Sequence, residues 1–242
     1  MGLFSLKKKK TESGGTKPPL RHIAFIMDGN GRWAKKRGLP REMGHKAGAE
    51  AFRRIVECCI DRDIELVTVY AFSTENWKRP QSEVDGIMKL FVEYLHDGLE
   101  NPRQKNSKIR FLGDNSRFSP EIRELMERIV EKSSHYPHAL NIAINYGGRD
   151  DIVYAVNSLI AEGKTEITEE DISSHLYTSG QPDPDLIVRT GGEWRLSNFL
   201  TWQSTYSELF FTNTLWPDMS DKDVDEALEF FTSRQRRFGQ VK

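Results

Sequence analysis

The chain has 242 residues, a length that favours one large α/β domain over two small ones. Its hydrophobic fraction of 37% and charged fraction of 29% are ordinary for a folded protein and exclude a disordered chain. The 35 Lys and Arg residues and 36 Asp and Glu residues give a formal net charge of -1, which argues against nucleic acid as a partner of the whole molecule.

Residues 1–19 are rich in Lys, Gly, Ser and Pro and are predicted to form a flexible basic tail, whose Lys7–Lys10 run is a solvated segment or a contact for anionic lipid. Residues 20–242 are assigned to one folded domain. No run in the sequence reaches the roughly 20 apolar residues that cross a bilayer. The two cysteines, Cys58 and Cys59, are adjacent, which disfavours a disulfide and favours a reducing compartment. We therefore expect a cytoplasmic protein.

Short apolar segments alternate with stretches in which apolar residues recur at helical spacing. Helix starts are predicted at Ser82, which has capping-box spacing to Asp85, and at Ser119, which precedes Pro120. The pattern predicts a single α/β domain with a mainly parallel six-stranded central sheet flanked by helices and joined by right-handed crossovers. The six predicted strands are residues 22–28, 66–72, 109–114, 140–147, 185–190 and 209–212.

Polar segments follow three of these strands, at residues 28–33 (DGNGRW), 72–80 (FSTENWKRP) and 189–197 (RTGGEWRLS). Ligands of parallel sheets bind at the carboxyl ends of strands. The glycines of the first segment allow close backbone approach, and the helix start after it offers N–H groups to an anion. The arginines of the other two segments suit phosphate oxygens. The three segments meet only if their strands are neighbours, which the sequence leaves open.

A site built from these segments would hold many cations and few carboxylates. The first segment lacks the Lys and Ser/Thr of a P-loop and the third Gly of a dinucleotide fingerprint. The chain also lacks a convincing Ser/His/Asp arrangement or a zinc-spaced Cys/His cluster. The chemistry of such a site would need no protein nucleophile.

Four long motifs carry a family resemblance: HIAFIMDGNGRWA at 22–34, YAFSTENWKRP at 70–80, NYGGRDDI at 145–152 and DLIVRTGGEWRLSNFLTWQ at 185–203. Through them the chain resembles the cis-prenyltransferases, in particular bacterial undecaprenyl diphosphate synthases, over residues 20–239, which identifies residues 20–242 as a catalytic domain. The resemblance implies Mg²⁺-dependent condensation of isopentenyl diphosphate with an allylic diphosphate, with farnesyl diphosphate expected as primer. The expected product is a long-chain Z-polyprenyl diphosphate, undecaprenyl diphosphate, which is the lipid carrier precursor for cell-wall polysaccharide synthesis.

The resemblance also implies roles for individual residues. Asp28 resembles the carboxylate that handles Mg²⁺ and the diphosphates, and Glu208 resembles a second metal-linked carboxylate. Asn76 resembles the proposed proton acceptor, but an amide is a poor base, so we expect it to position substrate while a diphosphate oxygen takes the proton. The allylic diphosphate site is expected at Gly29, Asn30, Gly31, Arg32, Trp33, Arg41 and His45; the closing loop at Ser73, Thr74, Glu75, Asn76, Trp77 and Arg79; and the isopentenyl diphosphate clamp at Arg189, Arg195, Leu196 and Ser197.

A growing prenyl chain needs a hydrophobic tunnel. His138 stands where relatives place an apolar residue near the far end of that tunnel, so it is a candidate limit on product length. The family further implies a homodimer, in which Arg237 and Gly239 reach the partner's active site or are exposed to solvent, and a peripheral contact with the inner face of the membrane for product release. The expected tunnel walls are Val84, Ile87, Met88, Phe91 and Leu95 on a helix and Leu140 and Ile142 on a strand.

Other interpretations of the same residues remain open at this stage. Asp28 could only cap the following helix, the arginines could be surface ion-pair residues, and Glu208 could be a solvated carboxylate at a strand edge. The rival function is a noncatalytic scaffold subunit of a heteromeric prenyltransferase, and Asp28, Asn30 and Arg32 argue against it. A hydrolase would need a water-activating base, and a trans-prenyltransferase would need paired DDxxD motifs, whereas Asp150 and Asp151 are only a pair.

Overall fold

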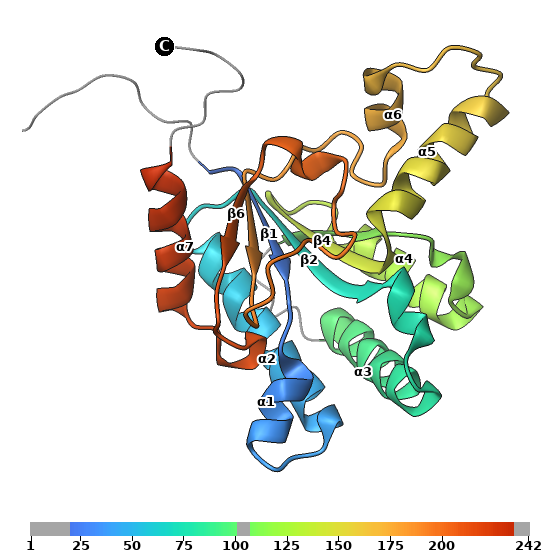
Figure 1. The fold of residues 1–242 in the computed structure, drawn as a ribbon. Coiled ribbons are helices and arrows are strands. Elements are labelled where there is room, and N and C mark those ends of the chain that lie inside the picture. Colours follow the sequence, from blue (N-terminus) through green and yellow to red (C-terminus); the bar gives the residue numbers. More distant parts are fainter. Residues whose placement is uncertain (1–19, 101–106, 235–242) are drawn as a thin grey trace, which may run out of the picture.

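The computed structural model describes residues 20–100 and 107–234 (Figure 1). The predicted tail at residues 1–19 and the predicted contacts of Arg237 and Gly239 lie outside the described residues. Among the helices of the described ranges, none has the length and apolar character needed to span a membrane.

One sheet of six parallel strands forms the centre of the described ranges, in the spatial order β3-β4-β2-β1-β5-β6. The predicted sheet is thereby confirmed, and each predicted strand overlaps an observed one. The strands are β1 (His22–Ile26), β2 (Leu66–Ser73), β3 (Ser107–Leu112), β4 (His138–Tyr146), β5 (Leu186–Arg189) and β6 (Glu208–Phe211).

Helices cover the sheet and connect its strands (Figure 1). In the described ranges the α-helices are α1 (Asn30–Lys36), α2 (Arg41–Ile60), α3 (Gln81–Glu100), α4 (Pro120–Ser133), α5 (Gly148–Ala161), α6 (Glu169–His175) and α7 (Asp221–Ser233). Short 3-10 helices are η1 (Thr74–Lys78), η2 (Asn115–Arg117), η3 (Gln203–Tyr206) and η4 (Trp216–Asp218). Figure 1 shows α5 and α6 forming an arm that projects away from the sheet.

The core lies on both faces of the sheet. Every residue of β1 and of β5 is buried, as expected for parallel strands covered on both sides. On one face, Ile23 and Phe25 belong to a cluster with buried residues of α2 and α7. On the other face, Ala24 and Ile26 belong to a cluster with Phe199. The alternation of side chains along β1 therefore anchors both layers.

The two predicted helix starts have different outcomes. The start at Ser119 is confirmed, because its hydroxyl accepts a hydrogen bond from the Ile122 N–H at 3.4 Å. The start at Ser82 is wrong, since α3 begins at Gln81 and the Pro80 carbonyl already accepts from the N–H of Glu83 at 2.9 Å. A proline just before the first turn thus displaces the serine from the capping position.

The strand order settles the question that the sequence left open. β2, β1 and β5 are adjacent, so the polar segments that follow them lie at the same edge of the sheet. β2 lies on one side of β1, and β5, which comes later in the chain, lies on the other side. Open α/β sheets form a ligand crevice where the strand order reverses in this way.

Candidate functional site

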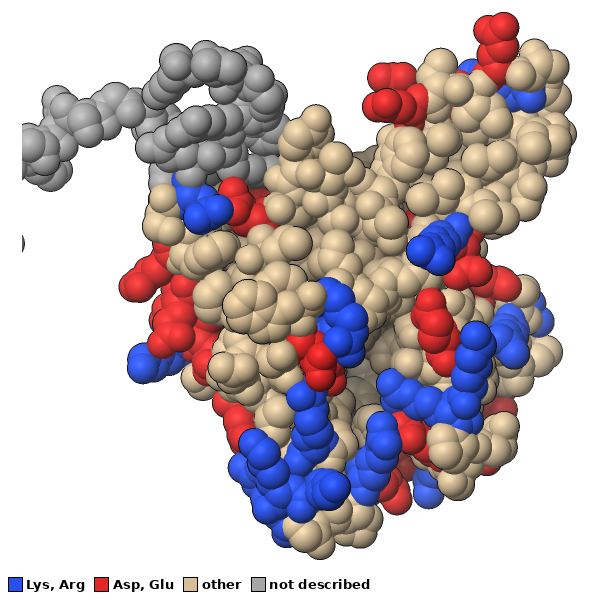
Figure 2. All heavy atoms as spheres, in the orientation of Figure 1, with Lys and Arg blue, Asp and Glu red and all other residues tan. Residues whose placement is uncertain are grey.

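A cleft of about 830 Å³ lies at the carboxyl ends of β1, β2 and β5. Figure 2 shows Lys and Arg side chains gathered around a hollow in the face that it displays. The cleft brings together most of the predicted site, because it is lined by Asp28, Gly29, Asn30, Gly31, Arg32, Arg41, His45, Ser73, Asn76, Arg79, Arg189, Arg195 and Ser197.

Asp28 is the carboxylate at the centre of this cleft. Its Oδ1 pairs with a terminal nitrogen of Arg32 and its Oδ2 with a terminal nitrogen of Arg189, each at 3.0 Å. Its backbone is held by Thr190, whose hydroxyl accepts from the Asp28 N–H at 3.0 Å and donates to the Asp28 carbonyl at 2.7 Å. Gly29 is the residue at the N-cap of α1, and no side chain caps that helix. Asp28 therefore holds two guanidiniums and is not a helix cap.

Gly29 makes the sharp turn from β1 into α1. Its φ is 117°, and a Cβ at this position would lie 2.9 Å from Cδ2 of Leu215. A glycine is needed here because other residues rarely adopt this φ and have no room. The turn directs the backbone of residues 29–32 along the cleft, where the first N–H groups of α1 have no intrahelical acceptor.

Arg189 is buried, with only 4% of its side chain exposed. Besides Asp28, its guanidinium donates to the hydroxyl of Ser197 at 2.8 Å and to the backbone carbonyl of Arg195. Its Nε has no hydrogen-bond acceptor in the described structure. A buried guanidinium with an open donor is not a surface ion-pair residue, and it is suited to bind an anion.

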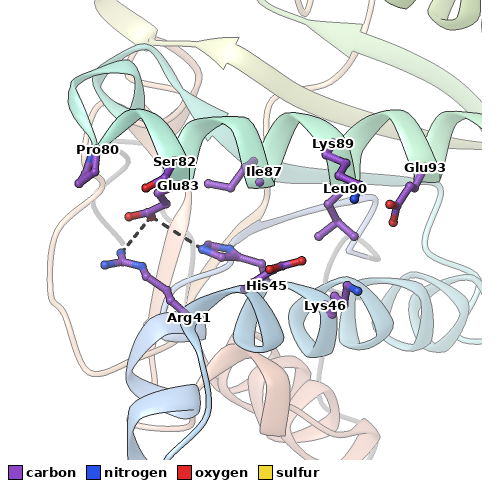
Figure 3. Close-up of a pocket in the computed structure, with 12 residues that line it drawn as sticks. Arg41, His45, Lys46, Pro80, Ser82, Glu83, Ile87, Lys89, Leu90 and Glu93 are labelled. Carbon is purple, nitrogen blue, oxygen red and sulfur yellow. Dashed lines mark ion pairs between the residues drawn. The ribbon is translucent and has the colours of Figure 1, made fainter.

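Glu83 is a site residue that the sequence interpretation missed. Its side chain is 11% exposed, and Oε1 lies 3.1 Å from a terminal nitrogen of Arg41, 2.9 Å from a terminal nitrogen of Arg79 and 3.8 Å from Nε2 of His45. Figure 3 shows Glu83 of α3 facing Arg41 and His45 of α2 across a pocket of about 390 Å³. The i,i+4 spacing of Arg79 and Glu83 was the available sequence signal.

His45 sits where the cleft meets this pocket. Burial lowers the pKa of its imidazole; the nearby Glu83 opposes the shift, and the positive charges of Arg79 and Arg41 add to it. The ring is therefore neutral at pH 7. Its Nε2 is buried without a hydrogen-bond partner among the described residues, so it is available to a ligand.

The loop after β2 begins with a reciprocal cap. Oδ1 of Asn76 accepts from the backbone N–H of Ser73 at 3.1 Å, and the Ser73 hydroxyl accepts from the backbone N–H of Asn76. The carbonyl oxygen of the Asn76 amide is thus engaged by its own loop. The amide N–H₂ group remains to face a ligand, and such a group donates protons to hydrogen bonds without accepting them.

Besides Glu208, which is described below, five predicted site residues are not part of the cleft lining: Trp33, Thr74, Glu75, Trp77 and Leu196. The two tryptophans pack elsewhere. The indole N–H of Trp33 donates to Oδ1 of Asp218 at 2.6 Å. The indole N–H of Trp77 donates to Oδ1 of Asn145 at 2.7 Å, and its ring packs edge-on against Phe72 with centroids 5.0 Å apart.

The other three residues join the cleft loops to the scaffold. The Thr74 hydroxyl donates to Oδ2 of Asp150 at 3.0 Å, and Oε1 of Glu75 accepts from Nδ2 of Asn198 at 2.9 Å. Leu196 packs against the core cluster below the cleft. The direction in which a loop side chain points depends on the backbone of its own turn, which the motif does not reveal.

Glu208 lies at the amino ends of the strands, whereas Asp28 lies at their carboxyl ends. It starts β6 and pairs in register with Leu186, whereas Phe211 pairs with Arg189. Three residues of strand separate these levels, which is about 10 Å. Oε2 of Glu208 is 3.2 Å from Nε of Arg234. The described chain therefore does not bring Glu208 to Asp28, and the described residues contain no group of three or more His, Cys, Asp or Glu placed to hold a metal ion.

An apolar cavity of about 170 Å³ adjoins the cleft. Asn30 and His45 line both, so the two spaces are contiguous at these residues. Of the predicted tunnel walls, Val84, Met88 and Leu140 are outside the cavity lining, and the others are in it. The apolar lining includes Met27, Phe52, Ile87, Leu90, Phe91, Leu95, Ile109, Phe111, Ile129 and Ile142.

His138 starts β4 on the same face as Leu140 and Ile142, since alternate strand residues share a face. Its Nδ1 lies 3.1 Å from the carbonyl oxygen of Ile64, and it is not part of the cavity lining. His138 thus precedes the buried Leu140 by two residues and lies at the amino end of β4.

Comparison with known proteins gives one consistent result. The model of a family described as "Putative undecaprenyl diphosphate synthase" matches residues 26–239. The isoprenyl transferase of Chromobacterium violaceum is 50% identical over 228 residues, which cover 94% of this chain and 90% of that protein. The isoprenyl transferase of Fusobacterium nucleatum is 50% identical over 225 residues, which cover 92% of this chain and 96% of that protein.

Solved structures agree with the fold. The lavandulyl diphosphate synthase of Lavandula x intermedia, in complex with dimethylallyl diphosphate, matches with a TM-score of 0.84 and 32% identity over 91% of this chain and 98% of that chain. A probable undecaprenyl diphosphate synthase from Campylobacter jejuni matches with a TM-score of 0.78 and 34% identity over 93% of this chain and 100% of that chain.

Proposed function

The chain belongs to the undecaprenyl diphosphate synthase family of isoprenyl transferases, and we propose that it condenses isopentenyl diphosphate with an allylic diphosphate, using farnesyl diphosphate as primer and yielding undecaprenyl diphosphate. The observation that carries the proposal is a cation-lined cleft at the strand ends that continues into an apolar cavity. A diphosphate head with a prenyl tail has this same division into an anionic and an apolar part.

The two substrates are assigned to the two sides of the cleft. The allylic diphosphate binds near Arg32, Arg41 and His45, because its tail can then enter the apolar cavity where His45 and Asn30 line both spaces. The isopentenyl diphosphate binds at Arg189, Arg195 and Ser197. A diphosphate can take the place of the Asp28 carboxylate on one guanidinium edge, since each guanidinium has five N–H donors.

The residues of the cleft favour departure of the allylic diphosphate. Arg32 and Arg41 offset the negative charge that grows on its oxygen as the C1–O bond breaks. The isopentenyl double bond forms the new bond to C1, and the proton lost from the isopentenyl C2 passes to a diphosphate oxygen. Asn76 positions isopentenyl diphosphate by donating from its amide N–H₂ group to diphosphate oxygens, since its own carbonyl oxygen accepts from the Ser73 N–H.

The residues of this cleft fit a Mg²⁺ ion that is coordinated jointly by the protein and by the substrate. Proteins commonly hold it through one or two carboxylates together with substrate phosphates, and Asp28, 30% exposed at the cleft centre, offers such a carboxylate. When bound there, the ion would neutralise charge on the diphosphates. The proposed second ligand, Glu208, would have to come from a different chain, given its place at the amino ends of the strands.

We also propose a homodimer that works in the cytoplasm and contacts the inner face of the membrane during product release, where its product serves cell-wall synthesis. Support for the dimer comes from large apolar side chains exposed on the α5 arm and beside β6. They include Val153, Tyr154 and Ile160 on α5 and Trp194, which is 79% exposed and stacks on Phe211 of the edge strand.

Incubation of the purified chain with farnesyl diphosphate, radiolabelled isopentenyl diphosphate and Mg²⁺ tests the function. We expect Mg²⁺-dependent incorporation that Asp28→Ala abolishes. Asp225→Ala is the matched control, because Asp225 also pairs with an arginine, Arg62, at 2.7 Å but lies on α7 outside the cleft. No incorporation by folded wild-type protein would refute the proposal and favour the scaffold subunit.

A further inference from the structure

Two loops of the cleft contact each other through Asn198. The loop after β2 carries Asn76, and the segment after β5 carries Ser197. Nδ2 of Asn198 donates to Oε1 of Glu75 at 2.9 Å, and this bond joins the loop to the segment. Glu75 precedes Asn76 directly, and Asn198 follows Ser197 directly. The bond therefore lies one residue from a cleft-lining group on each side.

Asn198 is itself fixed to the start of α5. Its Oδ1 accepts from the backbone N–H of Arg149 at 2.9 Å, and its backbone carbonyl accepts from the N–H of Gly148 at 2.7 Å. The loop after β2 reaches the same helix through Thr74, whose hydroxyl donates to Asp150 at 3.0 Å. The two contacts that Asn198 makes with α5 hold it in an orientation in which its amide N–H₂ faces Glu75.

The backbone around Asn198 requires such support. Ser197, Asn198 and Leu200 have φ values of 50°, 64° and 44°, in the left-handed region that side-chain-bearing residues seldom adopt. Strained backbone persists only where surrounding contacts hold it, and it clusters at functional sites. The contacts are also close, because a Cβ on Gly147 would lie 2.8 Å from both Nδ2 of Asn198 and Oγ1 of Thr74.

We propose that Asn198 is a positioning residue that holds the loop of Asn76 at a fixed distance from the Ser197 segment, so that the two diphosphates bind in reacting alignment. The inference rests on the proposed condensation. It also gives Thr74 and Glu75 a different role from the predicted one, since they hold the loop in place and do not contact substrate.

Alignment matters here because the reaction joins two bound molecules. A displacement of about 1 Å between reacting groups can lower a rate on the order of a hundredfold. The loop keeps its anchor through Thr74 when the Asn198 bond is lost, so we expect a smaller effect. We therefore expect loss of the bond to reduce kcat/KM for isopentenyl diphosphate about tenfold. The KM for the allylic substrate should change little, because Arg41 and His45 do not depend on Asn198.

A reversal of donor and acceptor tests the bond. Asn198→Asp places a carboxylate against Glu75; aspartate tolerates the left-handed backbone and keeps an oxygen for the Arg149 N–H. Glu75→Gln alone keeps an acceptor for Asn198. The double variant restores one amide and one carboxylate with their positions exchanged. Arg128→Gln on the exposed face of α4 is the charge control, since it shifts net charge by the same single unit.

We expect Asn198→Asp to lower kcat/KM about tenfold, the double variant to recover to within about twofold of wild type, and Arg128→Gln to match wild type. Amide hydrogen exchange of residues 73–79 should rise in Asn198→Asp and fall again in the double variant, whether or not the protein turns over. Unchanged activity and exchange in Asn198→Asp, or a loss that Glu75→Gln does not reverse, would overturn the inference. An inactive wild type would instead refute the proposed function.

Discussion

His22 provides a pH-dependent test of how neighbouring residues hold β5, the strand that ends at Arg189. The ring is buried in β1, where Nδ1 lies 2.8 Å from the carbonyl oxygen of Pro182 and Nε2 lies 2.7 Å from the hydroxyl of Thr68. A carbonyl can only accept, so Nδ1 carries the proton and Nε2 accepts from Thr68. Asn141 donates to the same hydroxyl oxygen at 3.1 Å. The neutral ring thereby holds the segment that leads into β5.

Burial lowers the pKa of His22 from 6.5 to about 4. Below pH 6.5 the unfolded chain binds a proton that the folded protein excludes, so the free energy of unfolding falls as the pH falls toward 4 and is fully retained above 6.5. Each pKa unit is worth about 1.4 kcal/mol, so this single group should remove roughly 2 kcal/mol of stability between pH 7 and pH 4.5.

Urea unfolding of wild type and His22→Gln at pH 7 and pH 4.5 measures this loss. Glutamine does not titrate, so the wild type should lose about 2 kcal/mol more than the variant over this interval, while contributions from other titrating groups cancel in the comparison. Equal losses in the two proteins would show that the His22 ring is not held neutral by burial, and would refute the reasoning.

Three further predictions concern the cleft and the limit on product length. Glu83→Gln should raise the KM for the allylic diphosphate about tenfold, because Arg41 and Arg79 lose their shared carboxylate; an unchanged KM in steady-state assays would contradict this role. Asn76→Ala should keep measurable turnover with a raised KM for isopentenyl diphosphate, whereas complete loss of turnover at saturating substrate would favour direct proton transfer. If His138 limits product length, His138→Ala should lengthen the products separated by chromatography, and an unaltered distribution would exclude that role.

Much of the fold could be predicted from local pattern. Buried strands such as β1 and β5 are continuous apolar runs, and these were identified within a few residues of their ends. The strand order could not be derived from pattern alone, because it depends on which crossover passes over which strand. Once β2, β1 and β5 are neighbours, the clustering of their polar segments follows directly.

The site was predicted less completely, for physical reasons. Motifs identify chain positions, but the direction of a side chain depends on turn geometry, so Trp33 and Trp77 were assigned to the cleft although their indole N–H groups bond elsewhere. Glu83 was missed because two of its partners, Arg41 and His45, come from another helix that is distant in the sequence. Glu208 was grouped with Asp28, although its register places it at the amino ends of the strands.

The most direct test of the account is whether one ligand fills both the cleft and the apolar cavity. Hydrogen exchange can be compared for protein with Mg²⁺ and inorganic diphosphate and for protein with Mg²⁺ and farnesyl thiodiphosphate, an unreactive allylic analogue. The account predicts that both ligands protect residues 29–32 at the start of α1, and that only the farnesyl compound also protects α3 around Phe91, which lines the cavity. Protection of α3 that is identical for the two ligands would contradict the claim that the prenyl tail enters the cavity.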